Sequence, residues 1–350
     1  RHVQGYEDTL QAPLQPLMDN LEAQTYETFE KDPMKYIKYE EGITKAIQHF
    51  HKKRTLERNS SDQVVLVLTV VGAGRGPLVA AALSASANTG IPLRIYAVEK
   101  NPNAVVILRS RVQSEVWSNV TVVDTDMRDW QPPELCDVMV SELLGSFGDN
   151  ELSPECLDGA QKCLRSDGVS IPQSYTSFIA PIATSKLWNM AKAFNLSNST
   201  IADGLNVAYV VRFHSSYQFA EAKPLFTFTH PNIPKEGTKI DNTRYGQVSF
   251  VSEADMVLHG LAGYFETVLF DPRSRVMLST VPQTHTEDMY SWFPLYIPLA
   301  QPVRVSRGQT VTAHLWRCVD AKKVWYEWCL SSPVRSPVQN SGGKSYSVGL

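Results

Sequence analysis

The sequence predicts an α/β domain built on a doubly wound parallel sheet, followed by a mainly antiparallel β-barrel domain. Apolar, β-branched runs alternate with helical segments between residues 64 and 165, and a glycine-rich turn follows the first run. After Gly168 the pattern changes to short alternating segments. The 350 residues carry a net charge of −3 and 43% hydrophobic side chains. This composition is ordinary for a globular chain and excludes a broad basic surface for nucleic acid.

Cysteine usage and hydropathy limit the class of protein further. The 5 cysteines include no C-x-x-C pair, which argues against a disulfide framework or a zinc knuckle. Cys156 and Cys163 fall two turns apart in an expected helix, where we expect buried thiols. No apolar run reaches the length of about 18 residues that a membrane helix needs, and no signal-peptide pattern begins the sequence. A reducing, intracellular compartment is therefore the default expectation.

Residues 1–54 are expected to form an extended arm and then a helical lid. Two prolines keep the arm open, and Leu17–Phe29 carries apolar residues at helical spacing. Asp32 and Pro33 are a helix-start signal, with Asp as the N-cap and Pro at the first helical position. This helix should reach about Lys53, and the polar stretch Thr55–Gln63 predicts a loop.

Residues 55–167 are expected to form the α/β domain. Val64–Val71 is a continuous apolar run of the kind that a buried parallel strand shows. The strands and helices that should follow are the helix Pro77–Ser86, the strand Leu93–Glu99, the helix Asn103–Val116, the strands Val120–Asp124 and Asp137–Ser141, and a helix that starts at Ser153-Pro154 and runs to about Arg165. Their order indicates a doubly wound sheet.

Residues 168–350 are expected to form the antiparallel domain. A polar, partly helical insertion at residues 186–207 is either an irregular loop or an arm for dimerisation. An aromatic cluster is expected in the barrel core rather than in a ligand cage, and it consists of Trp316, Trp325, Tyr326 and Trp328. Pro, Gly and Asn separate the expected strands, which include Tyr209–Phe213, Phe226–Thr229, Gln247–Val251, Val268–Phe270, Val276–Thr280, Thr310–Trp316 and Trp325–Leu330.

A glycine-rich turn joins the first strand to the next helix. Gly72, Gly74 and Gly76 form a G-x-G-x-G pattern, so the backbone can turn sharply and approach a ligand at a helix N-terminus. A dinucleotide fingerprint requires Gly or Ala where Pro77 stands. The turn therefore fits a nucleoside with an amino-acid tail better than a pyrophosphate. A plain tight turn without a ligand is the alternative.

Acidic residues follow the second and third strands. Glu99 ends the second strand, where a carboxylate can accept hydrogen bonds from ribose hydroxyls in this fold class. Asp126 can accept a hydrogen bond from an adenine amino group, and the thioether of Met127 can pack on the ring. Taken singly, these are ordinary strand-end and loop residues. Their position beside the glycine turn favours a nucleoside site.

Two glutamates follow the fourth strand and bracket a glycine-containing loop. Because this loop faces the ligand crevice, Glu142 and Glu151 can both reach one reacting group. A guanidinium is planar and always charged, and it forms bidentate pairs with carboxylates. Two carboxylates would hold it and draw its charge toward the paired nitrogens. A metal is the less favoured alternative, because no His or further acid lies nearby with ligand spacing.

The run from Val70 to Glu151 resembles the methyltransferase core of the protein arginine methyltransferases, whose double-glutamate loop has this spacing. The whole chain resembles the catalytic region of the type II members, which form symmetric dimethylarginine. Val71 and Gly148 are conservative departures. The segments that carry the resemblance are Glu99–Ala104, Glu142–Gly145, Asn150–Asp158 and Ser291–Pro294. It implies a class I methyltransferase fold, that is, a Rossmann-like doubly wound sheet followed by the β-barrel.

The resemblance also implies roles for individual residues. S-adenosyl-L-methionine would be the methyl donor, with no metal, and Glu142 and Glu151 would be the catalytic pair. Phe29 would stand where enzymes that form asymmetric dimethylarginine carry Met. Ser291, Trp292 and Phe293 would stand where those enzymes carry Thr-His-Trp. The donor site would be lined by Tyr26, Lys35, Tyr36, Glu99, Asp126 and Met127, beside the three glycines.

The resemblance implies partners as well. The expected substrates are arginine-containing proteins such as histone tails and Gly-Arg-rich RNA-binding proteins, in the cytoplasm and nucleus, with no membrane association. A homo-oligomer is expected. The family also has an N-terminal TIM-barrel domain that docks a WD-repeat partner, and this domain is not among the 350 residues. Two alternatives to the enzyme are a nicotinamide-dependent oxidoreductase and a catalytically silent binding module.

Overall fold

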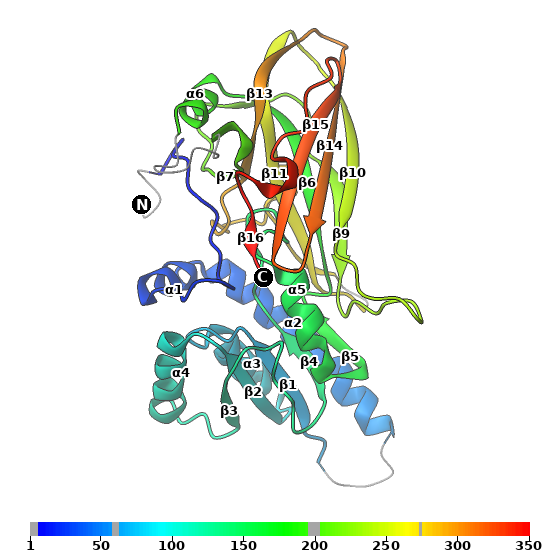
Figure 1. Ribbon diagram of the computed structural model, residues 1–350. Coiled ribbons are helices and arrows are strands. Elements are labelled where there is room, and N and C mark those ends of the chain that lie inside the picture. Colours follow the sequence, from blue (N-terminus) through cyan, green and yellow to red (C-terminus); the bar gives the residue numbers. More distant parts are fainter. Residues whose placement is uncertain (1–5, 58–62, 195–203, 273–274) are drawn as a thin grey trace.

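The computed structural model describes residues 6–57, 63–194, 204–272 and 275–350. They form a lower α/β part and an upper antiparallel part, with one long helix running between them (Figure 1). No helix within these ranges is both long enough and apolar enough to span a membrane.

A five-stranded parallel sheet forms the α/β part, in the order β3-β2-β1-β4-β5. The central strand β1 (Leu66–Val71) and its neighbour β4 (Cys136–Val140) are buried at every position. This explains their continuous apolar sequences. The other strands are β2 (Leu93–Glu99), β3 (Val120–Asp124) and β5 (Leu164–Ile171). Their carboxyl ends meet at one edge of the sheet, the edge where ligands bind in such folds.

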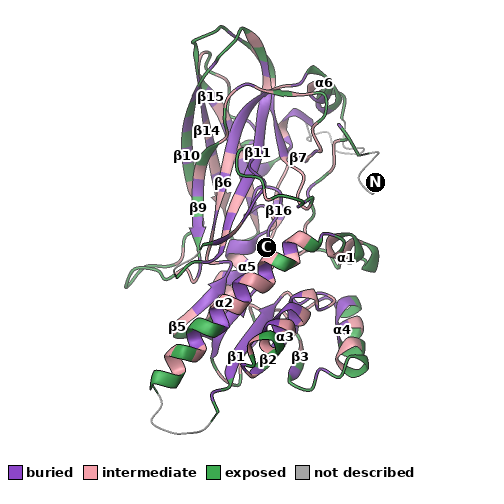
Figure 2. Ribbon diagram, turned by 180° about the vertical axis from the view of Figure 1, so that it is seen from behind, coloured by how far each residue is buried: buried purple, intermediate pink, exposed green. Residues whose placement is uncertain are grey.

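Five α-helices accompany this sheet, and α2 connects it to the antiparallel part. The buried side of α2 packs with α3 and β1 in a hydrophobic core that also includes Leu269 and Leu278 of the antiparallel part. Figure 2 shows buried segments alternating with half-buried and exposed ones along α2, as expected for a helix with one buried side. The helices are α1 (Ala23–Glu30), α2 (Pro33–Glu57), α3 (Pro77–Thr89), α4 (Pro102–Ser114) and α5 (Ser153–Ala160).

Two antiparallel sheets form the other part, and a shared core lies between them. The seven-stranded sheet has the order β7-β13-β11-β6-β8, with β12 paired to β11 and β9 paired to β6. The four-stranded sheet has the order β10-β14-β15-β16. Their bounds are β6 (Ser174–Ala183), β7 (Tyr209–Val210), β8 (Tyr217–Gln218), β9 (Lys223–Thr229), β10 (Arg244–Val251), β11 (Met256–Phe270), β12 (Val276–Ser279), β13 (Leu295–Val305), β14 (Thr310–Val319), β15 (Lys323–Ser332) and β16 (Val348–Gly349).

Two helices occur in the N-terminal region, as predicted, but their bounds differ from the predicted ones. The helix predicted over Leu17–Phe29 begins only at Ala23. The second helix begins at Pro33 as predicted and continues through Thr55 to Glu57, so the start of the predicted loop Thr55–Gln63 is helical. Residues 58–62 of that loop lie outside the described residues.

The end of the parallel sheet was predicted wrongly. The helix that begins at Ser153 ends at Ala160 rather than near Arg165, and a short 3-10 turn leads directly into β5. β5 continues the parallel sheet to Ile171, through the boundary predicted at residue 167. Its first residue and its last three are buried, whereas the four residues between them are exposed or half-buried. An edge strand with a largely polar sequence therefore gave no strand signal.

The antiparallel strands were predicted in part. β6 and β13 were missed, and β11 begins at Met256 rather than Val268. β13 contains prolines, which cannot donate a backbone hydrogen bond. They are tolerated because the edge of β13 opposite β11 pairs with β7 only at Leu295 and Tyr296. Within the insertion predicted at residues 186–207, α6 spans Ser185–Ala193 and a 3-10 turn spans Gly204–Asn206. Residues 195–203 lie outside the described residues, so dimerisation through this insertion stays a prediction.

Candidate active site

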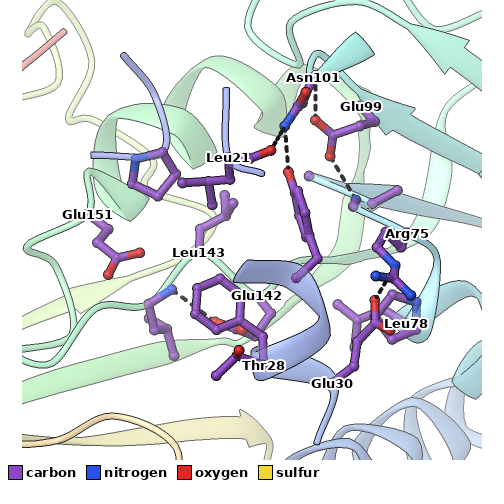
Figure 3. A pocket seen from close by; sticks show the side chains of 18 of the residues that line it. Leu21, Thr28, Glu30, Arg75, Leu78, Glu99, Asn101, Glu142, Leu143 and Glu151 are labelled. Atoms are coloured by element: carbon purple, nitrogen blue, oxygen red, sulfur yellow. Dashed lines mark hydrogen bonds and ion pairs between the residues drawn. The ribbon is translucent and has the colours of Figure 1, made fainter. Parts of the chain in front are cut away.

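A cavity of about 620 Å³ opens at the carboxyl edge of the parallel sheet, beneath α1. Its wall combines the glycine turn, the ends of β2 and β3, the double-glutamate loop, α2 and the segment 290–293 (Figure 3). All but one of the predicted site residues line it: Tyr26, Phe29, Lys35, Tyr36, Gly72, Gly74, Glu99, Asp126, Met127, Glu142, Glu151, Ser291, Trp292 and Phe293.

The exception is Gly76. Its φ is 95°, and a side chain there would meet Leu108 at 2.8 Å and the Trp117 ring at 3.3 Å. Both neighbours belong to the far side of the turn, toward α4. Packing and backbone conformation therefore account for a glycine at this position, which does not line the cavity. A G-x-G-x-G pattern cannot distinguish these two uses.

Glu99 and the glycine turn form one hydrogen-bonded unit. The Gly74 N–H donates to Glu99 Oε2 at 2.7 Å, and the Asn101 N–H donates to Oε1 at 2.7 Å. Burial raises the pKa of Glu99, and these two backbone donors oppose the shift. Each carboxylate oxygen has a second lone pair, so Glu99 can still accept hydrogen bonds from a diol in the cavity.

Asp126 is less free than the sequence suggested. Its Oδ1 accepts bonds from the N–H and Nε of Arg128, at 2.8 and 3.0 Å, and Oδ2 accepts from Nη2 at 2.9 Å. Burial raises the pKa of Asp126, but the bonds from Arg128 outweigh burial and lower it overall. The neighbouring Met127 packs, like Leu143, against the hydrophobic cluster around Val71 and Met139, and it lies 3.5 Å from where a side chain on Gly72 would be.

Three anchors hold the lid helix over the glycine turn. Lys100 Nζ donates to the Leu17 carbonyl at 2.6 Å, and Asn101 Nδ2 donates to the Leu21 carbonyl at 2.9 Å. Arg75 donates to the Ala23 carbonyl at 3.2 Å and lies 3.3 Å from the carboxylate of Glu30 on α1. Sequence reasoning did not select these anchors. Arg75 could have been selected because a long cationic side chain stands within the glycine turn.

Glu142 is paired with a buried cation. Lys35 Nζ lies 3.0 Å from Glu142 Oε2, and the Leu144 N–H donates to Oε1 at 3.2 Å. Burial lowers the pKa of Lys35, but the charges and hydrogen bonds of Glu142 and Tyr36 together outweigh burial, so the net shift is upward. Three aromatic rings surround the same ammonium, with centroids at 4.9, 5.1 and 5.6 Å, and they belong to Tyr36, Trp292 and Phe29.

Glu151 faces the same space from the other end of the loop. Figure 3 shows its carboxylate pointing into the pocket without a hydrogen bond to the side chains drawn. Burial raises the pKa of Glu151 well above its usual value, and the charge of Glu142 raises it further. Across the described ranges, no group of three or more His, Cys, Asp or Glu side chains is arranged to hold a metal ion.

The double-glutamate loop is a tight hairpin. Gly145 and Gly148 bond to each other through both N–H groups, at 3.1 and 2.8 Å. A side chain on Gly145 would overlap Asn150, which accepts the Phe147 N–H at 2.7 Å. Trp292 closes the open side, because its Nε1 donates to the Leu144 carbonyl at 2.7 Å. The hairpin thereby brings Glu142 and Glu151 to one pocket, as predicted.

A second hollow, of about 400 Å³, adjoins the first. The N-terminal arm and α1 form its outer wall, including Gln11, Leu14 and Glu22. Phe29, Glu151 and Trp292 belong to the walls of both hollows. Glu151 therefore stands where the first cavity and this second hollow, the outer groove, adjoin.

Comparison with known proteins identifies the family. Residues 1–171 match the family described as PRMT5 arginine-N-methyltransferase, and residues 174–348 match the PRMT5 oligomerisation domain. The chain belongs to the PRMT5 family. It is 50% identical over 348 residues to "Protein arginine N-methyltransferase 5" of Xenopus laevis, covering 99% of this chain and 53% of that protein. It is 40% identical to the skb1 methyltransferase of Schizosaccharomyces pombe, covering 99% of this chain and 56% of that protein.

The PRMT5-family chain spans about half the length of these curated relatives. Among solved structures, the Trypanosoma brucei PRMT1 enzyme-prozyme complex superposes with a TM-score of 0.70 at 17% identity, covering 92% of this chain and 96% of that one. Arabidopsis thaliana protein arginine methyltransferase 10 gives 0.69 at 15% identity, with 94% and 98% covered. These likenesses confirm the predicted fold class.

The raised pKa of Glu151 predicts a pH-dependent effect on the stability of this PRMT5-family chain. Ionising Glu151 is harder in the folded state than in the unfolded state, so the wild type loses stability as the pH rises from about 4.5 through the folded-state pKa. Glu151→Gln removes this loss. The variant should unfold at a higher temperature than the wild type near pH 7.5, and this advantage should disappear below pH 4.5, where both forms are neutral.

Thermal unfolding across this pH range measures the effect. Glu253→Gln, at an exposed position, is the control and should change the unfolding temperature little at any pH. A Glu151→Gln variant that is less stable than the wild type at pH 7.5 would contradict the proposed cost of ionisation.

Proposed function

We propose that the chain is the catalytic part of an S-adenosyl-L-methionine-dependent protein arginine methyltransferase, forming monomethylarginine and symmetric dimethylarginine. The charge balance of the pocket is the observation that carries the proposal. Glu142 and Glu151 face one space, and Lys35 compensates one of the two carboxylates. One negative charge is left for one incoming cation, in a pocket walled by aromatic rings.

The donor side of the cavity has the features that S-adenosyl-L-methionine requires. A volume of about 620 Å³ lies within the usual range for small-molecule pockets. Glu99 would accept from the ribose hydroxyls, and Asp126 and Met127 would meet the adenine ring. Tyr26, Lys35 and Tyr36 would line the rest, and Gly72 and Gly74 allow close approach. When bound, this donor supplies an electrophilic methyl group on a sulfonium.

The acceptor side fits an arginine side chain that arrives through the outer groove. Glu151 and Glu142 would bind two edges of the guanidinium and draw its charge toward those edges. The third nitrogen would keep more lone-pair character and face the donor. Arrival of the guanidinium would also lower the pKa of Glu151, which burial and Glu142 hold high in its absence. Catalysis would then consist of positioning and electrostatics.

The glycine turn provides a test of the donor site. Gly74→Val puts a β-branched side chain at φ 54°, in contact with the Tyr26 ring at 3.1 Å. Strain of this kind costs about 1–3 kcal/mol. Donor affinity should fall at least about 10-fold, which corresponds to about 1.4 kcal/mol. Gly90→Val is the matched control, because Gly90 also has a positive φ but open space around it.

Isothermal titration with S-adenosyl-L-methionine measures both variants, and NAD serves as a control ligand. Folded Gly74→Val protein with wild-type donor affinity would remove the glycine turn from the donor site. Tight binding of NAD instead would favour an oxidoreductase.

The glutamate pair provides the direct test of the activity. Glu142→Gln and Glu151→Gln keep the side-chain shape but remove the charge that orients the guanidinium. Turnover of a Gly-Arg-rich peptide should fall by about 10²–10³-fold in each, the usual effect of one electrostatic contact in a transition state. Donor affinity should survive. Mass spectrometry of the peptide measures turnover, and near-wild-type turnover at saturating peptide would exclude that residue from catalysis.

Product specificity is proposed to depend on Phe29. Its ring lines both hollows and lies 5.6 Å from the Lys35 ammonium, beside the space between the two glutamates. A rigid ring there would admit only a bare nitrogen next to the donor methyl, whereas the flexible Met side chain would leave room for a methylated one. Phe29→Met should therefore form some asymmetric dimethylarginine alongside the symmetric form.

Fragment ions distinguish the two dimethylarginines by loss of dimethylamine or monomethylamine. Phe50→Met, in the core of α2 away from the cavity, is the control and should alter stability without altering the product. A purely symmetric product from active Phe29→Met protein would reduce Phe29 to a packing residue.

The proposal extends to the oligomeric state, the substrates and a partner of the whole protein. The match of residues 174–348 to an oligomerisation domain supports a homo-oligomer. Histone tails and Gly-Arg-rich RNA-binding proteins are the proposed substrates, in the cytoplasm and nucleus. A WD-repeat partner would bind through a part of the protein that these 350 residues do not include.

A further inference from the structure

The loop that carries Glu151 is held by a buried polar network from the antiparallel part. Asp149, two residues before Glu151, accepts bonds at Oδ2 from Arg317 Nε at 2.5 Å and from the Tyr326 hydroxyl at 2.6 Å. Its Oδ1 accepts a bond from the Ser177 hydroxyl at 3.1 Å. The side chains of Asp149 and Arg317 are both 0% exposed. None of the four residues that form this network lines either hollow.

Arg317 also binds the chain on the other side of Glu151. Its Nη1 and Nη2 donate to the two carboxylate oxygens of Glu155, in the first turn of α5, both at 2.8 Å. One guanidinium thus joins a residue before Glu151 to a residue after it, and its planar fork fixes their geometry. Figure 1 shows α5 where β14 and β15 approach the parallel sheet.

The backbone between these two anchors is strained. Leu152 has a φ of 67°, a left-handed conformation that non-glycine residues adopt only when their surroundings impose it. Its N–H donates to the Asp149 carbonyl at 3.1 Å, and its carbonyl accepts from Cys156 at 3.0 Å. Glu151 therefore stands inside a turn whose two ends are both tied to Arg317.

Stability alone does not account for this network. A buried ion pair often stabilises a protein no more than apolar side chains of the same size would, and in some proteins it specifies one arrangement. The arrangement specified here is that of the turn carrying Glu151.

We propose that Arg317 and Tyr326 are positioning residues, which act through Asp149 and Glu155 to hold the Glu151 carboxylate in register with Glu142. This inference rests on the proposed function, in which both carboxylates bind one guanidinium. A displacement of about 1 Å in such a site can reduce turnover about 10²-fold. The antiparallel part would therefore set the geometry of the reacting group, besides supplying Val210 and Trp292 to the wall of the outer groove.

Conservative variants test the proposal, because removal of Arg317 outright would leave buried carboxylates unpaired. Tyr326→Phe removes one hydroxyl and keeps the ring, and Arg317→Lys keeps the charge but loses the bidentate fork. Tyr264→Phe is the matched control. Tyr264 is a buried tyrosine of β11 whose hydroxyl donates to Gln218 at 2.8 Å, and neither residue lines the cavity.

Turnover and donor affinity of the 350-residue chain are measured separately on a Gly-Arg-rich peptide. Tyr326→Phe should lower kcat about 10-fold, with unchanged donor Kd, and Arg317→Lys should lower it further, toward the 10²-fold expected for a misplaced group. Tyr264→Phe should stay close to the wild-type kcat even if it unfolds at a lower temperature. Equal losses of kcat in Tyr326→Phe and Tyr264→Phe would overturn the proposal.

Hydrogen exchange supplies a measurement that does not depend on activity. The amides of residues 143–151 should exchange faster in Tyr326→Phe and Arg317→Lys than in the wild type or in Tyr264→Phe. Unchanged exchange in this segment would overturn the positioning role. If the wild-type chain transferred no methyl group, the proposed function would fail, and the exchange rates would still decide whether Arg317 and Tyr326 hold the loop.

Discussion

A surplus of buried negative charge governs the pocket. Glu142 and Glu151 face one enclosed space, and the single ammonium of Lys35 lies beside them. In a low dielectric, an uncompensated carboxylate must find a cation or take up a proton. This constraint accounts for the burial of Lys35 among three rings and for the raised pKa of Glu151. It also explains why the surrounding loop needs firm support, since like charges held together would otherwise move apart.

The two structural parts divide the work of building this pocket, but they are not independent units. Only two residues separate β5 from β6, and Leu269 and Leu278 of the antiparallel part belong to the core beneath α2. Trp292 packs against the cores of both parts while it bonds the double-glutamate loop. The parallel sheet therefore supplies the strand ends that carry acidic groups, and the antiparallel sheets fix where those groups point.

Local sequence patterns predicted the residues at the strand ends, because hydrophobic periodicity places each strand and the fold class places its carboxyl end. Glu99, Glu142 and Glu151 all lie in the cavity for this reason. The same patterns grouped Gly76 with Gly72 and Gly74, although Gly76 does not line the cavity, since a glycine needed for packing looks like one needed for a ligand. The helix α5 begins at Ser153, as predicted, and Leu152 occupies its cap position.

Long-range partners left no local signal. Arg317 and Asp149 are 168 positions apart, and nothing around either residue indicates that they meet. The lid anchors Lys100 and Asn101 bind carbonyls about 80 residues earlier in the chain. Among the aromatic cluster, Tyr326 and Trp328 are in the core as expected, but Trp316 and Trp325 lie half-buried on the opposite face of their strands. The alternation of side chains along a strand distinguishes the two buried rings from the two half-buried ones, whereas the presence of four aromatic residues in two strands does not.

The way the lid is attached has a consequence for how its sequence can change. The side chains of Lys100, Asn101 and Arg75 bind carbonyl oxygens of Leu17, Leu21 and Ala23, which every amino acid offers. Substitution of the lid's side chains would leave these attachments in place. Apart from Tyr26 and Phe29, which line the inner cavity, and Glu30, which pairs with Arg75, the side chains of α1 and its approach are therefore free to diverge. Related proteins could in this way acquire different substrate preferences without rebuilding the pocket below.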